Sequence, residues 1–285
     1  MKIIINFKSK ILLFSIITAF LQYSCSTSDL RGFEFSNFQN TPLEKFAIAV
    51  KNDDIDEINS LIKSNKYDIN YKDPINQQTL LSLAIVNHKK NAFLKLLRLG
   101  ADPNLIIGQL EDSSALSEAI KMSQKWKMFY IANLLKNKAN PNLLIIPKSQ
   151  NYFSDYYPIF TAIVYSDNYD VIQLLVNYGA DINVCNPHSI SNVYCDGVLQ
   201  NCLDQKKMLL LRYFIIEAKI KIPKIVYFKG GFDEKKQKEF SLTEILNTEE
   251  YKFEDFEEDG AKTDFSEYRR YRLEIIQYLK KTRQY

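Results

Sequence analysis

The sequence predicts an all-α solenoid, in which short helices form pairs and the pairs stack along one axis. Three observations lead to this fold class: apolar residues recur in i, i+3, i+4 triplets, the triplets come in pairs, and turn-forming residues follow each pair. The second triplets start at Ile58, Phe93, Ile131, Ile172 and Leu211, so successive starts lie 35, 38, 41 and 39 residues apart. A recurrence of this length is typical of stacked helical repeats.

The first helix of each pair carries a small residue in the middle of its triplet, which allows the next helix to approach closely. These triplets are Phe46, Ala49, Val50; Leu81, Ala84, Ile85; Leu116, Ala119, Ile120; Ile159, Ala162, Ile163; and Leu199, Cys202, Leu203. The second helices carry larger residues: Ile58, Leu61, Ile62; Phe93, Leu96, Leu97; Ile131, Leu134, Leu135; Ile172, Leu175, Val176; and Leu211, Phe214, Ile215. Each triplet predicts one buried face of a short helix.

The stretch 79–104 shows the whole unit most clearly. Asn87 and His88 separate its two triplets, and both residue types tolerate the left-handed backbone of a tight turn. Gly100 follows the second triplet as a helix stop, and Pro103 prevents the helix from continuing. The unit is therefore helix, turn, helix, turn.

The chain resembles ankyrin-repeat proteins at the ends of this unit. Thr79 to Ala84 reads TLLSLA, similar to the family's T-P-L-H-x-A opening, and 100–104 and 179–183 read GADPN and GADIN. Weaker copies of that ending stand at 67–70 and 138–142. The resemblance implies hairpin fingers between repeats and a concave protein-binding face. The five repeats run over about 41–72, 79–104, 114–142, 157–183 and 197–223.

The N-terminus has the layout of an exported lipoprotein. Lys2, Lys8 and Lys10 precede an apolar run, and this run is too short to span a bilayer as a helix. The following segment, LQYSC, resembles a bacterial lipobox with Cys25 as the lipid attachment site, although Gln22 and Tyr23 depart from the strict pattern. We therefore expect a signal peptide at 1–24 and a membrane-anchored protein facing the periplasm or cell surface; ordinary cleavage and release as a soluble secreted protein is the alternative.

Residues 25–40 are expected to form the lipid-attached tether. Ser26 to Asn40 has no helical periodicity and reads as a flexible link. Its phenylalanines, Phe33, Phe35 and Phe38, give an alternative in which the segment docks on the first repeat.

Charge argues against a nucleic-acid partner. The whole chain has 37 basic and 34 acidic residues. Removal of 1–24 takes away three lysines and no acidic residue, which leaves 34 of each. A formally neutral chain lacks the basic excess that nucleic-acid binding uses. We expect a monomer without cofactors.

Three cysteines remain once Cys25 is assigned. Cys202 occupies the small core position of a first helix and is expected to be a buried thiol. Cys185 and Cys195 flank one finger, where a disulfide would suit an exported protein; two free thiols are the alternative. A metal site is not expected, because only His188 joins these two cysteines.

The third and fourth fingers are long and carry the candidate partner-binding residues. Apolar and aromatic side chains on a surface loop mark contact sites, unless the loop folds back over the helices. The candidates are Ile145, Ile146, Tyr152, Phe153 and Tyr156 in the third finger, and Asn192, Val193 and Tyr194 in the fourth. Trp126, in an expected three-residue insertion between two helices, either packs on the adjacent repeat or contacts a partner.

Residues 224–285 are expected to cap the solenoid, with the alternative of a true sixth repeat. Ser241 and Glu244 have the spacing of a capping box. Leu242 and Ile245 with Ile275, Tyr278 and Leu279 would supply its two apolar faces, separated by an acidic insertion at 249–259.

The sequence contains no recognisable catalytic constellation. It has two histidines, His88 and His188, and no zinc-protease, nucleophile-elbow, P-loop or dinucleotide motif. We therefore expect a membrane-tethered extracytoplasmic protein-binding scaffold and not an enzyme. The alternative is a structural or protective cell-envelope lipoprotein without a single partner.

Overall fold

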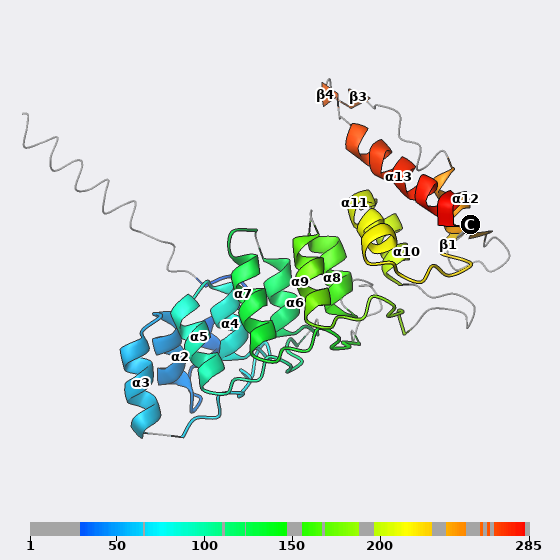
Figure 1. Ribbon diagram of the computed structural model, residues 1–285. Coiled ribbons are helices and arrows are strands. Elements are labelled where there is room, and N and C mark those ends of the chain that lie inside the picture. The colour runs from blue at the N-terminus through cyan, green and yellow to red at the C-terminus, as the bar shows by residue number, and fades with distance from the viewer. Residues whose placement is uncertain are drawn as a thin grey trace, which may run out of the picture.

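The protein is a stack of helix pairs in the computed structural model (Figure 1). The structure describes residues 29–64, 66–109, 112–122, 124–146, 156–166, 169–187, 197–229, 238–248, 257–258, 261–262 and 265–282. In the pairs at the start of the stack, α2 (Glu44–Lys51) precedes α3 (Ile55–Ser64), and α4 (Leu80–Val86) precedes α5 (Lys90–Arg98). Then come α6 (Ala115–Lys121) with α7 (Gln124–Lys136), α8 (Pro158–Tyr165) with α9 (Asp170–Asn177), and α10 (Val198–Asp204) with α11 (Met208–Arg212).

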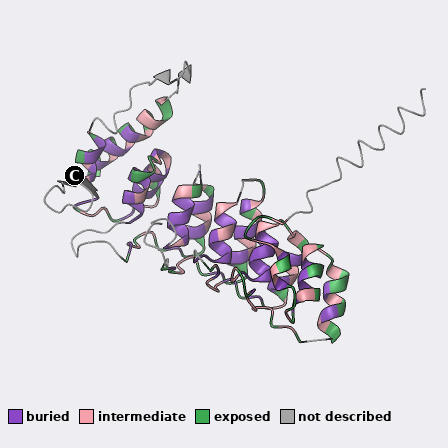
Figure 2. Cartoon of the chain, turned by 180° about the vertical axis from the view of Figure 1, so that it is seen from behind, coloured by how far each residue is buried: buried purple, intermediate pink, exposed green. Residues whose placement is uncertain are grey.

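First helices pack on first helices along the stack, in the order α2, α4, α6, α8 and α10. All residues of the five first-helix triplets are buried, and only Ile62 and Val176 of the second-helix triplets are partly exposed. Figure 2 shows these buried residues concentrated in the helices of the stack. The prediction of an all-α repeat fold is confirmed. Within the described ranges, the short strands follow the fifth helix pair.

Left-handed backbone occurs at matching places in successive repeats. Asp53, His88 and Lys206 have φ of 56°, 59° and 53° between the two helices of their pairs. After the second helices, φ is 88° at Gly100 and 90° at Gly179, and Lys138 takes the same region. The turn predicted at His88 is confirmed, and non-glycine residues adopt this conformation at four of these six positions at a steric cost.

The first helices of the second and third repeats begin with a polar side chain that satisfies a backbone N–H group. The Thr79 hydroxyl accepts from Ser82 N at 3.2 Å, while Thr79 N donates to the Ser82 hydroxyl at 3.1 Å. Ser114 accepts from Ser117 N at 3.1 Å in the next repeat. These caps explain the T/S-x-x-S spacing, since the first N–H groups of a helix lack partners within it.

Asparagines link the first four repeats in what we call the asparagine ladder, formed by Asn70, Asn104 and Asn142. Each lies at the end of its repeat and accepts a backbone N–H from the following repeat through Oδ1: from Asp102 at 2.8 Å, Asn140 at 2.7 Å and Asp181 at 2.7 Å respectively. Asn104 and Asn142 also donate through Nδ2 to the carbonyls of Lys138, at 3.0 Å, and Gly179, at 2.7 Å. The Asn of the G-A-D-x-N ending therefore fixes the distance between neighbouring repeats.

The segment before the first repeat is docked, which corrects the expected tether from residue 29 onward. A 3-10 helix, η1 (Phe35–Phe38), buries Phe35 and Phe38 in the core. Lys51 forms an ion pair with Asp29 at 3.0 Å. Asn87 accepts from Leu30 N at 2.9 Å and donates to the Phe33 carbonyl at 2.9 Å. Aromatic burial and these bonds outweigh the freedom of a flexible link; 25–28 lie outside the described residues.

The third repeat differs from the prediction in where its second helix begins. Helix α7 starts at Gln124, so Trp126 and Met128 lie in its first turns and not in an inter-helix insertion. Trp126 is partly buried against the core, with Lys90 Nζ of the preceding repeat 2.8 Å from its ring centroid. The cation-π contact joins two repeats, which favours the packing interpretation of Trp126.

The C-terminal part packs on the fifth pair. After α11 the backbone widens into a π-helix, η2 (Tyr213–Glu217), followed by the antiparallel strands β1 (Tyr227–Lys229) and β2 (Lys238–Phe240). Helix α12 (Leu242–Leu246) begins with the predicted capping box of Ser241 and Glu244, which is confirmed. A second strand pair, β3 (Glu257–Glu258) and β4 (Ala261–Lys262), precedes α13 (Ser266–Thr282).

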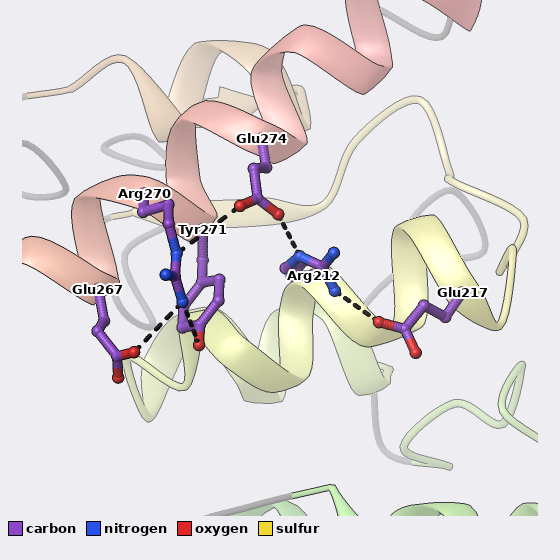
Figure 3. A network of polar contacts seen from close by, with 6 residues as sticks. All are labelled: Arg212, Glu217, Glu267, Arg270, Tyr271 and Glu274. Atoms are coloured by element: carbon purple, nitrogen blue, oxygen red, sulfur yellow. Dashed lines mark hydrogen bonds and ion pairs between the residues drawn. The ribbon is translucent and has the colours of Figure 1, made fainter.

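Helix α13 contacts α11 through buried apolar residues and a charged network (Figure 3). Ile275 and Leu279 are buried in the core, as are Leu242 and Ile245 of α12. Arg212 of α11 donates to Glu274 of α13 and to Glu217 of η2, the latter at 2.5 Å. Arg270 joins Glu274 from the other side at 3.8 Å. Partly exposed ion pairs of this kind contribute little to the free energy of folding. Their contribution here is to the orientation of α13 on α11. The assignment of 224–285 as a cap or a sixth repeat stays an interpretation.

Candidate protein-binding surface

The first finger, between repeats one and two, is held rigidly by a buried carboxylate. Asp73 is fully buried, and its oxygens accept from the backbone N–H groups of Ile75 at 2.9 Å, Asn76 at 2.7 Å and Gln78 at 2.8 Å. A backbone bridge between Lys72 and Thr79 closes the finger. Charge-assisted bonds to three N–H groups of one loop fix its conformation, so Ile75 at its tip has a defined position.

Neighbouring fingers are joined to one another. Lys72 Nζ donates to the Ile106 carbonyl at 2.5 Å, and Gly108 N donates to the Gln77 carbonyl at 3.2 Å. The second finger repeats the first one's closure, with a bridge between Ile107 and Ser113. These links join the first and second fingers, and fingers occupy the same place in successive repeats. We call the exposed apolar residues Ile75, Leu144 and Ile146 on the fingers the finger row.

The third finger corrects part of the predicted binding set. Ile145 and Tyr156 are buried, and Ile145 N donates to the Tyr156 carbonyl at 2.9 Å. Tyr156 belongs to the hydrophobic core and Ile145 is equally hidden from solvent, so the prediction that these two side chains contact a partner is contradicted by their burial. Ile146, the next residue, points the other way along an extended segment and is 56% exposed. Tyr152 and Phe153 lie outside the described residues.

The fourth finger is anchored at Cys185, which is disulfide-bonded. Its predicted partner, Cys195, lies outside the described residues, as do Asn192, Val193 and Tyr194, so the Cys185–Cys195 pairing and these three contacts stay predictions. Cys185 also forms a backbone bridge with Gly197, just before α10. This bridge closes the base of the finger.

The described residues offer little reactive chemistry. Burial raises the pKa of the Cys202 thiol far above its usual value, so it stays protonated and is a poor nucleophile. Partial desolvation, with Lys90 and Lys89 nearby, lowers the pKa of His88. No group of three or more His, Cys, Asp or Glu side chains is placed to hold a metal ion in the described ranges.

The residues missed by the sequence prediction are those of the first finger. Ile75 is 55% exposed and Leu144, in the third finger, is 39% exposed. Ile75 stands alone among polar residues in DPINQQ, and an isolated apolar residue at a loop tip could have identified it. Asp73 carried no such indication, because its role depends on three N–H groups that only the folded loop brings together.

No helix within the described ranges has both the length and the apolar character needed to cross a membrane. Cys25 and the apolar run before it lie outside those ranges.

Comparison with known proteins identifies one unit of the stack directly. Residues 154–187 match the family model described as Ankyrin repeat, and this segment contains α8 and α9. A comparison with curated proteins gives no match. Ankyrin-repeat domains are typically non-catalytic binding scaffolds. The chain is thus an all-helical repeat stack that contains an ankyrin repeat at 154–187.

Proposed function

We propose that the protein is a binding scaffold for another protein and that the finger row is its contact surface. The observation that carries the proposal is a set of three exposed apolar side chains, Ile75, Leu144 and Ile146: Ile75 lies in a finger held by the Asp73 bonds, and Leu144 and Ile146 flank the described bond from Ile145 N to the Tyr156 carbonyl. A partner that covers exposed apolar side chains removes them from water, which favours binding by roughly 25 cal/mol per Å² of apolar surface buried. A rigid support lowers the ordering cost of binding.

The finer proposal is that a lipid on Cys25 holds this scaffold on the extracytoplasmic side of a membrane. The basic and apolar segments before Cys25 support export, and the lipobox-like residues support lipid attachment. Asp29 is fixed to Lys51, so a lipid on Cys25 would be joined to the folded stack by only Ser26, Thr27 and Ser28. This link spans at most about 14 Å, which would place the first repeat next to the lipid headgroups.

Lipid attachment is tested by detergent phase separation. Wild-type protein expressed with its own N-terminus should partition into the Triton X-114 phase and incorporate an alkyne-labelled fatty acid. Cys25→Ser should lose the label, while Cys202→Ser, which alters a buried thiol, should keep it. Label retained by Cys25→Ser, or a wild-type protein found wholly in the aqueous phase, would contradict the anchor and favour the secreted form.

Partner binding is tested by cross-linking pull-down from native membranes. The double variant Ile75→Asp, Ile146→Asp places charges on the finger row. The control Leu273→Asp changes an equally exposed apolar residue, 50% exposed, on α13. A discrete protein captured by wild type and the control but lost from the double variant supports the proposal. The same captured set with all three proteins, each folded by circular dichroism, would favour a structural envelope role instead.

A further inference from the structure

The asparagine ladder stops at Asn183, although the local turn is unchanged. Asn183 N donates to Asp181 Oδ1 at 2.8 Å, as Asn104 N donates to Asp102 and Asn142 N to Asn140, both at 2.9 Å. In contrast to Asn104 and Asn142, Asn183 is exposed. The side-chain contact it makes is a long one within its own turn, from Nδ2 to Asp181 Oδ1 at 3.4 Å. Its carboxamide forms no bond to the fifth repeat among the described residues.

The reason lies in the end of the fifth repeat. In the three preceding repeats an alanine after the left-handed residue donates to a carbonyl five positions back: Ala101 to Leu96, Ala139 to Leu134 and Ala180 to Leu175, each at 3.0 Å. The π-helix η2 adds one residue to this turn, so Ile220 donates six positions back, to the Phe214 carbonyl at 2.9 Å. The backbone that would meet Asn183 is therefore displaced, and π-helical insertions of this kind recur at functional sites.

A cavity of about 310 Å³ is lined by Asn183 and residues of the fifth repeat, where the inter-repeat asparagine bond is absent. Ile182, Val184, Val198, Leu199, Ile220 and Val226 form most of its wall. Asn183 and Lys221 are polar lining residues, and both are exposed. This volume corresponds to roughly ten water molecules and lies within the range of ligand pockets. An apolar wall beside an amide donor and acceptor suits a ligand with both kinds of group.

We infer that this cavity binds an extended polypeptide segment, whose backbone amide pairs with the Asn183 carboxamide and whose aliphatic side chain enters the cavity. The bonds of the asparagine ladder indicate which kind of ligand the cavity would bind. Asn104 and Asn142 each bind a backbone N–H and a backbone C=O through the two ends of one carboxamide. Asn183 offers the same two groups to a partner in place of the fifth repeat. The inference rests on the proposed protein-binding function but uses a site separate from the finger row.

The test is methyl NMR of the full-length chain with the peptide Ac-Ala-Ala-Leu-Ala-Ala-NH₂ as the probe. The expected result is a saturable shift of the Val184, Val198 and Ile220 methyl signals. A peptide with Asp in place of Leu should give no shift. In a set of analogues with one amide each replaced by an ester, at least one should bind about tenfold more weakly, as expected for one lost hydrogen bond.

Two variants separate the carboxamide from the cavity. Asn183→Ala should weaken binding of the leucine peptide about tenfold and leave the other methyl signals in place. Val184→Trp should fill the cavity and abolish binding. Three results would overturn the inference. The leucine peptide could shift the methyl signals equally in wild type and both variants, or no peptide could give a saturable shift. A fatty acid could also move these signals when the peptide does not. The finger variant Ile75→Asp, Ile146→Asp should bind the peptide normally, so failure at one site is distinguishable from failure at the other.

Discussion

The asparagines at the repeat ends show how one residue type acquires different roles from its neighbours. Asn142 accepts from Asp181 N and donates to the Gly179 carbonyl, whereas Asn183 has the same turn and no rung to the next repeat among the described residues. We predict that Asn142→Ala lowers the free energy of unfolding by about 1–3 kcal/mol, because two inter-repeat bonds are lost. Asn183→Ala should change it by less than about 0.5 kcal/mol.

Urea unfolding followed by circular dichroism measures both variants. Equal losses of stability would mean that Asn183 also supports the stack and that its carboxamide is not available to a ligand.

His88 gives a prediction for pH. Partial desolvation and the nearby Lys90 and Lys89 disfavour the protonated ring in the folded state, so its pKa should lie below 6.5. As pH falls, His88 is therefore protonated at a higher pH in the unfolded chain than in the folded protein. The contribution of His88 to stability is therefore complete above pH 6.5 and declines as the pH falls through the lowered pKa. Its exposure keeps the effect small.

An NMR titration of the imidazole signals measures this pKa. His88→Asn, which keeps a residue tolerant of φ 59°, identifies the signal by its loss and leaves that of His188. A value at or above 6.5 would contradict the prediction.

Among the elements, α5 depends on a residue of the preceding repeat. The Asp53 carboxylate accepts from Ala92 N at 2.6 Å and from the Asn91 side chain at 2.9 Å, at the beginning of α5. A carboxylate at a helix N-terminus satisfies free N–H groups and interacts favourably with the helix dipole. Asp53→Ala should therefore lower the free energy of unfolding by about 1–2 kcal/mol.

Asp56→Ala is the matched control, because Asp56 is an exposed carboxylate one turn away in α3. Denaturant unfolding should show a much smaller loss for this variant. Similar losses in both would indicate a general charge effect and no specific cap.

The docked N-terminal segment is a second test at this scale. Phe38 is fully buried and lies beside Tyr71, with ring centroids 6.2 Å apart. Phe38→Ala should lower the free energy of unfolding by about 3–5 kcal/mol, as for other large-to-small core changes. An exposed residue, as in Leu30→Ala, should have little effect. If Phe38→Ala also had little effect in thermal unfolding, the segment would be a tether after all.

Helices were predictable here because their buried faces are local patterns. The triplets such as Leu81, Ala84 and Ile85 recur at helical spacing and are buried as predicted. The boundaries were less predictable: Trp126 lies in α7 and contacts Lys90 of the previous repeat, and a pattern local to the third repeat does not contain this contact. The buried position of Phe38 also depends on contacts with other elements. These contacts cannot be predicted from a segment that has no helical periodicity.

At the scale of the whole molecule, the candidate site was only partly predictable. Ile145 and Ile146 are both apolar in the sequence, yet one is buried and the other exposed, because the finger lies against the stack on one side only. The absence of an inter-repeat bond at Asn183 accompanies one extra residue in η2, and the local sequence pattern predicts neither feature. In a repeat protein, features that recur in every repeat can be predicted from the sequence, whereas features that occur in one repeat are much harder to predict.

The most direct test of the central claim is site-specific photo-cross-linking on native membranes, with benzoylphenylalanine in place of Ile75, Ile146 or Leu273 in separate proteins. If the finger row binds a protein, the probes at Ile75 and Ile146 should form the same cross-linked product, and the probe at Leu273 on α13 should not. The absence of a defined product at both finger positions, or one formed equally at Leu273, would contradict a partner-binding role for the finger row.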